Sequence, residues 1–254
     1  MKKLLSDFLE FIRFRICIFV TCIGIIGYLL FNTISMNLVF VVLASFLVTA
    51  GAYSFNNITD KKEDLINRKK INPFLINKSG YLISAICFSF GMFFSFFLSV
   101  YSIVFCSLGL FVSITYSFFR LKERFLVKNL YTGFGASVVF LAGASCISLE
   151  IFLYYLIFSL FIFIGSTISD LRDYEGDRLS NIKTLPVYLG YEVCKKIDFV
   201  LLSIFSVVIL FFSHFIILLP FSIVMFYFLY KNKPSLAHSC EGFSFIFLVL
   251  WSVI

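Results

Sequence analysis

Long apolar runs alternate with short polar stretches along almost the whole chain. A helix needs about 17–25 apolar residues to cross a bilayer, and runs of roughly this size cover residues 16–34, 36–55, 81–99, 101–119, 129–148, 151–169, 198–213, 215–230 and 240–254. The pattern predicts an all-α integral membrane protein with about nine transmembrane helices, in a single domain over residues 1–254. Because the 198–213 and 215–230 runs are short and the last run ends with the chain, eight spans are the alternative.

The composition agrees with this pattern. The chain is 61% hydrophobic and 14% charged, whereas soluble domains are about 45–50% apolar and about 25% charged. The seven cysteines include no CxxC pair, so they are interpreted as small hydrophobic residues rather than disulfides or metal ligands. The opening MKKLLSDFLEFIRFR contains Asp7 and Glu10 and is expected to be a short interfacial helix, not a signal peptide.

The basic residues give the membrane orientation. All 21 Lys and Arg fall in five clusters, at residues 2–15, 61–78, 120–128, 172–196 and 231–233. Two predicted spans separate each cluster from the next, and the intervening turns contain no Lys or Arg. The positive-inside rule therefore places the N-terminus and all five clusters in the cytoplasm. The net charge of +7 indicates this orientation and cytoplasmic anionic ligands, and not nucleic acid.

Two acidic stretches occur where predicted spans end on the cytoplasmic side. In NNITDKKEDLIN, Asn56, Asp60 and Asp64 have i, i+4, i+8 spacing and share one helix face. In DLRDYEGDRLSNIKTLP, Asp170, Asp173 and Asp177 have i, i+3, i+7 spacing and also form one face.

Carboxylates at the ends of membrane spans are costly unless they pair, line a cavity or bind a cation. Two acidic stripes facing each other repel unless divalent cations lie between them. Mg²⁺ uses only one or two carboxylates per ion and completes its shell with water and phosphate oxygens, so the two stripes predict a Mg²⁺–diphosphate site. Basic residues interleaved with the stripes are candidates to neutralise phosphate oxygens: Arg68, Lys122, Arg172, Arg178 and Lys183. The alternative for each of them is an ordinary solvated helix end.

These motifs resemble those of the UbiA-type intramembrane prenyltransferases. NNITDKKEDLIN is similar to the first family motif, NxxxDxxxD, and DLRDYEGDRLSNIKTLPVYLG is similar to the second, which closes on Thr-Leu-Pro. The resemblance covers nearly the whole chain. It implies a helical bundle around a lipid-accessible cavity, in which two Mg²⁺ ions bridge a polyprenyl diphosphate.

The resemblance also assigns residues. Asp60, Asp64, Asp170, Asp173 and Asp177 match the metal-binding and catalytic carboxylates. Further positions match substrate-binding residues: Asn56, Arg13 before the first span, and Tyr116, Lys122 and Asn129 in YSFFRLKERFLVKNL. Two features depart from the family pattern. Ile16 stands where an Asn is frequent, and NRKKINPFLINKSG lacks the usual Arg-Pro pairs.

The form of the second motif resembles archaeal members that add a geranylgeranyl chain to geranylgeranylglyceryl phosphate. A basic cytoplasmic rim suits such a phosphorylated, lipophilic acceptor. Aromatic or quinone, chlorophyll-type and carotenoid acceptors are the alternatives within the family.

Two other classes of membrane protein fit the sequence less well. A cation-coupled transporter usually holds its acids near the middle of the bilayer, and a CDP-alcohol phosphotransferase has a glycine- and alanine-containing acidic motif that is absent here. The sequence identifies no general base, because His214 falls on the opposite side of the membrane and His238 is expected to be remote from the motifs.

Overall fold

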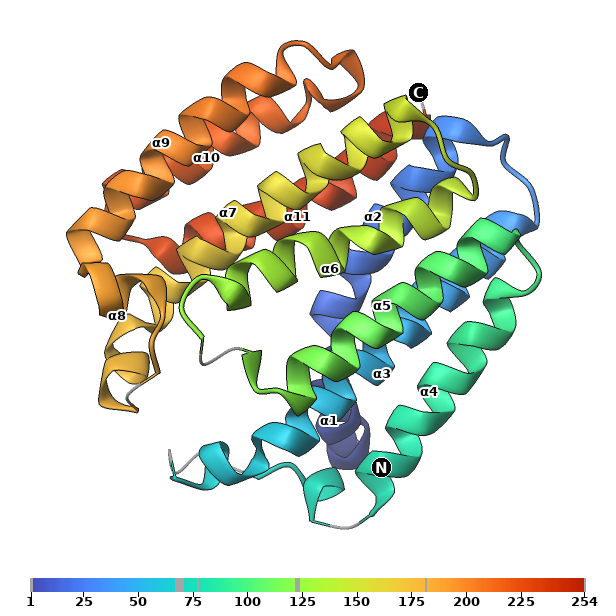
Figure 1. Ribbon diagram of the computed structural model, residues 1–254, viewed down its shortest axis with the longest axis horizontal. Helices are drawn as coiled ribbons and strands as arrows, with labels where there is room; N and C mark the ends of the chain where they lie inside the picture. The colour runs from blue at the N-terminus through green and yellow to red at the C-terminus, as the bar shows by residue number, and fades with distance from the viewer. Residues whose placement is uncertain (1, 67–70, 77, 122–123, 181, 254) are drawn as a thin grey trace. The chain divides into compact units, whose positions relative to one another are not determined.

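Helices are the only regular elements in the computed structural model, which describes residues 2–66, 71–76, 78–121, 124–180 and 182–253 (Figure 1). They are α1 (Lys2–Phe11), α2 (Phe14–Phe31), α3 (Asn37–Ile66), α4 (Ser79–Ser95), α5 (Val100–Phe118), α6 (Val127–Ala144), α7 (Leu149–Leu179), α8 (Leu185–Leu189), α9 (Tyr191–Ile209), α10 (Leu218–Tyr230) and α11 (Pro234–Val253). Short 3₁₀ turns occupy Pro73–Leu75 and Ser213–Phe215. The all-α prediction is confirmed.

Each apolar run in the sequence lies largely on one helix of the described chain. Helices α2, α3, α5, α7 and α11 are long and apolar enough to cross a membrane, and α4 and α10 are shorter apolar helices. The chain therefore has the helices of a multi-pass membrane protein. The number of spans, about nine or eight, stays a prediction.

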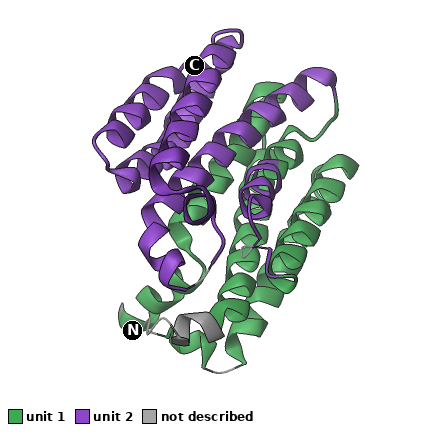
Figure 2. Cartoon of the chain, turned by 60° about the vertical axis from the view of Figure 1, so that its left-hand side comes forward, with its two compact units in different colours: residues 1–119, 138–147 green, residues 120–137, 148–254 purple. Residues whose placement is uncertain are grey.

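Contacts divide the chain into two compact units (Figure 2). Unit 1 comprises residues 1–119 and 138–147, and unit 2 comprises residues 120–137 and 148–254. Helix α6 is shared, because its first part belongs to unit 2 and its second part to unit 1. A single domain over residues 1–254 stays a prediction.

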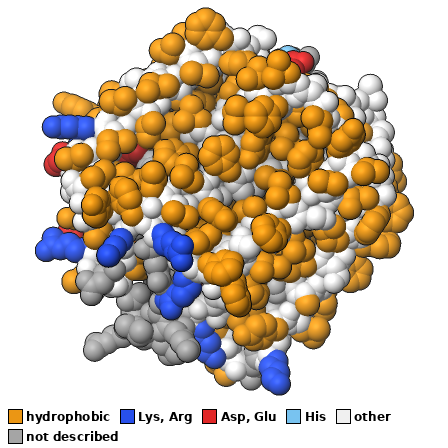
Figure 3. Space-filling view, in the orientation of Figure 1, with side chains coloured by type: hydrophobic (Ala, Val, Ile, Leu, Met, Phe, Trp, Pro, Cys, Tyr) orange, Lys and Arg blue, Asp and Glu red, His pale blue; other side chains and the backbone are white. Residues whose placement is uncertain are grey.

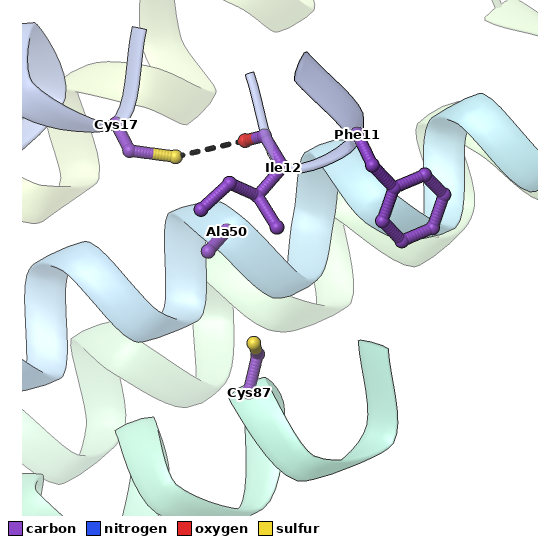
Figure 4. Packing of buried hydrophobic residues seen from close by; sticks show 5 residues of the cluster. All are labelled: Phe11, Ile12, Cys17, Ala50 and Cys87. Atoms are coloured by element: carbon purple, nitrogen blue, oxygen red, sulfur yellow. Dashed lines mark hydrogen bonds between the residues drawn. The ribbon is translucent and has the colours of Figure 1, made fainter. Parts of the chain in front are cut away.

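Unit 1 is organised around α3, which packs against α2, α4 and α5. A buried cluster joins the first residues of the chain to α3 and α4, and consists of Phe11, Ile12, Cys17, Ala50 and Cys87 (Figure 4). The Cys17 thiol donates to the carbonyl of Ile12 at 3.1 Å. These contacts fix the end of α1 beside the helix that carries the first acidic motif.

Unit 2 is organised around α7, which packs against α8, α9 and α11. Its core is aromatic: Phe161 stacks on Phe205 of α9 with ring centroids 4.6 Å apart, and Phe158 contacts Phe215 at 5.3 Å. Phe245 of α11 packs on the same two α7 rings. This packing holds α9 and α11 against the helix that carries the second acidic motif.

Large hydrophobic side chains also cover much of the surface that Figure 3 shows. Exposed examples occur on α4, α5, α9 and α11, including Phe90, Phe111, Val207 and Phe247. A soluble monomer rarely exposes so much contiguous apolar surface. These side chains have the character expected of residues that face lipid.

Two glycines of unit 1 allow α2 and the second part of α6 to touch through their backbones. A Cβ added at Gly143 would lie 2.0 Å from the carbonyl oxygen of Gly24, and one added at Gly27 would lie 2.2 Å from that of Phe140. Small residues permit this kind of close helix approach in membranes. The contact has no space for any larger residue, because both obstacles are backbone atoms.

We expect Gly143→Ala to destabilise the purified protein by about 1–3 kcal/mol, the usual cost of overpacking a tight contact, and to lower its melting temperature in detergent. Gly109→Ala is the matched control, because a Cβ there meets nothing within 4 Å and alanine favours the helix by up to about 1 kcal/mol. Equal melting temperatures for the two variants would contradict the backbone contact.

Candidate functional site

Both acidic motifs lie on the last turns of the two longest described helices. Helix α3 has 30 residues and α7 has 31, which corresponds to about 45 Å each at 1.5 Å per residue. The hydrocarbon core of a bilayer is only about 30 Å thick. Each helix is therefore longer than a span requires, and its C-terminal turns can extend beyond the hydrocarbon core. The prediction that each helix continues through its acidic motif is confirmed.

In the first motif, in unit 1, the structure confirms that Asn56 and Asp60 share one face of α3, whereas the side chain of the third predicted member, Asp64, lies outside the description. The Asn56 side-chain amide donates to Asp60 Oδ2 at 2.9 Å, one turn further along α3. Asn56 Oδ1 accepts a hydrogen bond from the Ser117 hydroxyl of α5 at 3.3 Å. Tyr116, the neighbour of Ser117, is half-buried. Asn56 thus orients the Asp60 carboxylate and connects it to α5.

Arg13 lies beside the first motif. It has φ 51° between α1 and α2, and its guanidinium donates to Asn57 Oδ1 from Nε at 3.2 Å and from Nη2 at 3.0 Å. The same guanidinium lies 5.4 Å from the centre of the Tyr53 ring. Asn57 also donates to the carbonyl of Phe11 at 2.7 Å. Sequence reasoning missed Asn57, although the Asn-Asn doublet was visible.

The second motif, in unit 2, begins with a fully buried carboxylate. Asp170 has no exposed surface. It forms a salt bridge with Lys128 of α6, and Asp170 Oδ2 accepts a hydrogen bond from Asn129 at 3.0 Å. Asn129 also donates to the Ser166 hydroxyl at 3.1 Å. The predicted site residues Asn129 and Asp170 are therefore in direct contact.

Lys128 was not among the predicted site residues. The sequence signal was its position next to Asn129 in the basic cluster of residues 120–128. From the sequence alone, Lys128 could not be distinguished from Lys122, which is the lysine that matches the family motif. Lys122 and Arg68 both lie outside the described residues. The side chain of Asp64 also lies outside the description.

Asp173 and Arg172 form a bidentate pair on the exposed side of α7. The guanidinium contacts Asp173 at 2.8 Å and 2.7 Å, and it also donates to the Ser169 hydroxyl at 2.9 Å. Such planar pairs are also the geometry by which Arg recognises phosphate.

Asp177 lies against the Thr-Leu-Pro segment that follows α7. Its carbonyl accepts a hydrogen bond from the Ile182 amide at 2.9 Å. Asp177 Oδ2 and the Thr184 hydroxyl are both buried and make no hydrogen bond of good geometry among the described residues, although Thr184 lies close enough to Asp177 to favour its charged form. Burial nevertheless raises the pKa of Asp177 above its ordinary value. Lys183, between these positions, is exposed. A buried carboxylate oxygen without a partner is costly, and a bound cation would satisfy it.

The three α7 acids do not form a compact ligand cage. Among the described residues, no group of three or more His, Cys, Asp or Glu side chains converges as metal ligands do. Mg²⁺ needs only one or two carboxylates, with water and phosphate oxygens completing its shell. A cation at this end of α7 would therefore need further ligands, such as water or phosphate oxygens, to complete its shell.

We expect Lys128→Ala to destabilise the protein by about 3–5 kcal/mol, the usual cost of leaving one member of a buried ion pair alone. The measurement is the melting temperature in detergent. Lys196→Ala, which removes an exposed lysine of unit 2, serves as the control. A Lys128→Ala protein as stable as the control would show that Lys128 does not hold Asp170.

Comparison with known proteins agrees with this geometry. The UbiA prenyltransferase family model matches residues 17–251. A digeranylgeranylglyceryl phosphate synthase from Methanococcus aeolicus is 29% identical over 214 residues, covering 80% of this chain and 76% of that protein. One from Saccharolobus solfataricus is 28% identical over 216 residues, with the same coverage.

Solved structures share the fold. A UbiA homologue from Archaeoglobus fulgidus bound to GPP and Mg²⁺ superimposes with a TM-score of 0.77 at 14% identity, over 97% of this chain and 98% of that one. An apo UbiA homologue from Aeropyrum pernix K1 superimposes with a TM-score of 0.79 at 17% identity, over 93% of this chain and 96% of that one. With the family match over most of its length, this chain belongs to the UbiA prenyltransferase family and is a membrane-embedded prenyltransferase.

Proposed function

We propose that this chain transfers a geranylgeranyl group from its diphosphate to the free hydroxyl of geranylgeranylglyceryl phosphate, forming an ether bond at the cytoplasmic face of the membrane. The observation that carries the proposal is the acidic end of α7. There Asp170 is neutralised by Lys128, whereas Asp177 Oδ2 is buried beside the Thr184 hydroxyl and makes no hydrogen bond of good geometry among the described residues. Such an oxygen fits a divalent cation and an anionic donor.

The choice of donor and cation is supported by the chemistry of the acidic residues and by the ligands of related structures. The Archaeoglobus fulgidus homologues were solved with GPP or DMAPP and Mg²⁺. For this chain we assign the binding of two Mg²⁺ ions and of the donor diphosphate to Asp60 and Asp64 of α3 and to Asp170, Asp173 and Asp177 of α7. When bound, Mg²⁺ stabilises the diphosphate as the leaving group of the transfer.

The chain's own residues prepare this chemistry. Asn56 orients Asp60 through its 2.9 Å hydrogen bond, and Lys128 and Asn129 hold Asp170 in one position. Arg172 offers a planar donor group for phosphate oxygens. We place Arg13, Arg68, Tyr116, Lys122 and Lys183 in the donor or acceptor site as further binding residues.

The choice of acceptor is supported by the names of the relatives and by the basic residues near the acidic motifs. Two relatives at 28–29% identity are named for synthesis of digeranylgeranylglyceryl phosphate. The basic clusters next to the acidic motifs suit an acceptor that itself carries a phosphate. Aromatic or quinone, chlorophyll-type and carotenoid acceptors remain the competing assignments.

An acceptor panel tests the assignment. We expect the purified protein, with Mg²⁺ and labelled geranylgeranyl diphosphate, to prenylate geranylgeranylglyceryl phosphate. We expect no product from 4-hydroxybenzoate, a dihydroxynaphthoate, a chlorophyllide or lycopene. Asp60→Asn, which keeps the shape of the side chain and removes its charge, should lose at least about a hundredfold in rate. Product from another acceptor alone would retain prenyl transfer and reject the ether-lipid assignment.

Asp177→Asn tests the role of the unpartnered carboxylate. Removing this charge should lower the transfer rate by about a hundredfold without lowering the melting temperature, because the variant no longer buries an unsatisfied charge. Glu175→Gln is the matched control, since it removes an exposed acid from the same turns of α7. Equal transfer rates for the two variants would exclude Asp177 from the site.

A further inference from the structure

Three lysines gather where α9 begins and α10 ends, in unit 2. Lys195 lies near the start of α9, and Lys231 and Lys233 lie in the turn between α10 and α11. Asn232, in the same turn, accepts a hydrogen bond from Lys195 Nζ at its side-chain oxygen. This contact, together with the packing of α9 on α10 (Figure 1), brings the three lysines to one surface, which we call the lysine cluster.

The lysine cluster has no carboxylate to neutralise it. Within the part of the chain that the structure describes, none of its three lysines forms an ion pair. Glu192 is the only acid in residues 191–197 and 227–236. Lys128 and Arg172 differ in this respect, because each is paired with an aspartate. A surface that concentrates one sign of charge attracts ligands of the opposite sign, so the lysine cluster suits an anion.

Aromatic side chains indicate the depth of the lysine cluster in the membrane. Lys231 Nζ lies 5.5 Å from the centre of the Tyr230 ring and 5.9 Å from that of Tyr227. Both tyrosines are exposed, and further along α10 the exposed side chains are apolar, as at Phe226 and Ile223. Tyrosines concentrate where lipid meets water. The lysine cluster is therefore expected at the level of the lipid head groups.

A groove on α9 begins beside the lysine cluster. It has a volume of about 280 Å³ and is lined by Val193, Lys196, Ile197, Val200 and Leu201. Pockets that enclose a small molecule usually measure about 300–1,000 Å³, so this groove suits a segment of a chain and not a whole ligand. A lysine on an apolar lining contributes its methylene groups and keeps its ammonium group in water.

We propose that this end of α9 and α10 binds an anionic phospholipid of the surrounding membrane. Its phosphate contacts Lys195 and Lys231, and one of its hydrocarbon chains lies in the α9 groove. Basic side chains at a membrane surface attract anionic lipids, which are concentrated in the cytoplasmic leaflet, and the positive-inside rule predicts that this end of the helices is cytoplasmic.

The two halves of the site together select the occupant. A soluble phosphate leaves the apolar groove empty, and a lipid without net charge leaves the lysine cluster without a counter-charge. A bound phospholipid satisfies both. It also stabilises the folded chain, because any ligand that binds only the folded state does so. The site uses none of the acidic motif residues, so it is tested without donor or acceptor and independently of the proposed function.

The test titrates protein purified in a neutral detergent with phosphatidylglycerol or with phosphatidylcholine of the same chains, and counts bound lipid by native mass spectrometry. We expect the wild type to bind phosphatidylglycerol at least about tenfold more tightly. High salt should remove this preference, because it screens exposed charges. The double variant Lys195→Gln/Lys231→Gln should lose the preference and keep the wild-type melting temperature in phosphatidylcholine.

Two further variants separate the lysine cluster from charge in general and from the groove. Lys78→Gln/Arg124→Gln removes the same charge from two other exposed positions and should keep the preference. Val200→Trp places a large side chain in the groove and should weaken the binding of both lipids.

An unchanged preference in the Lys195→Gln/Lys231→Gln protein would overturn the inference. So would an equal loss in the Lys78→Gln/Arg124→Gln control, because net charge would then explain the result. Displacement of phosphatidylglycerol by an equal concentration of glycerol phosphate would reject a lipid as the occupant. Wild-type binding of both lipids by Val200→Trp would reject the placement of a chain in the groove.

Discussion

The burial of one charge, Asp170, constrains much of unit 2. A carboxylate with no exposed surface at the end of a membrane helix must be paired, and here Lys128 and Asn129 of α6 supply the partners. The pair fixes the start of α6 against α7. Because α7 continues past Asp170, the same fixation determines where Asp173, Asp177 and the Thr-Leu-Pro segment lie. The contacts that neutralise Asp170 therefore also fix the positions of the functional residues that follow it on α7.

The fold was largely predictable because a membrane imposes strong rules on the sequence. Apolar runs such as 151–169 must be helical, since no water satisfies their backbone groups, and α7 indeed covers that run. The i, i+4 spacing of Asn56 and Asp60 correctly predicted that they share one face of α3, where the structure shows them hydrogen-bonded. The pattern could not predict which atoms of a neighbouring helix lie against Gly143 or Gly165. A glycine in an apolar run does not indicate which part of the chain it contacts.

The candidate site was predictable to the extent that it follows helical spacing. The acidic stripes on α3 and α7 follow helical spacing, whereas partners supplied by another helix do not. Lys128 and Asn57 became visible only through packing, because each contacts a residue distant in sequence. Within unit 2, α6 and α7 bring Lys128 and Asp170 into contact, although the two residues are 42 positions apart along the chain.

The central claim is that the acidic helix ends hold a prenyl diphosphate through divalent cations. The most direct measurement is equilibrium binding of labelled geranylgeranyl diphosphate to the wild-type protein as Mg²⁺ is titrated, with no acceptor present. The account predicts that donor binding rises with Mg²⁺ and is lost when EDTA removes it. Donor binding that is equally tight with and without Mg²⁺ would contradict the account, because basic residues alone would then suffice.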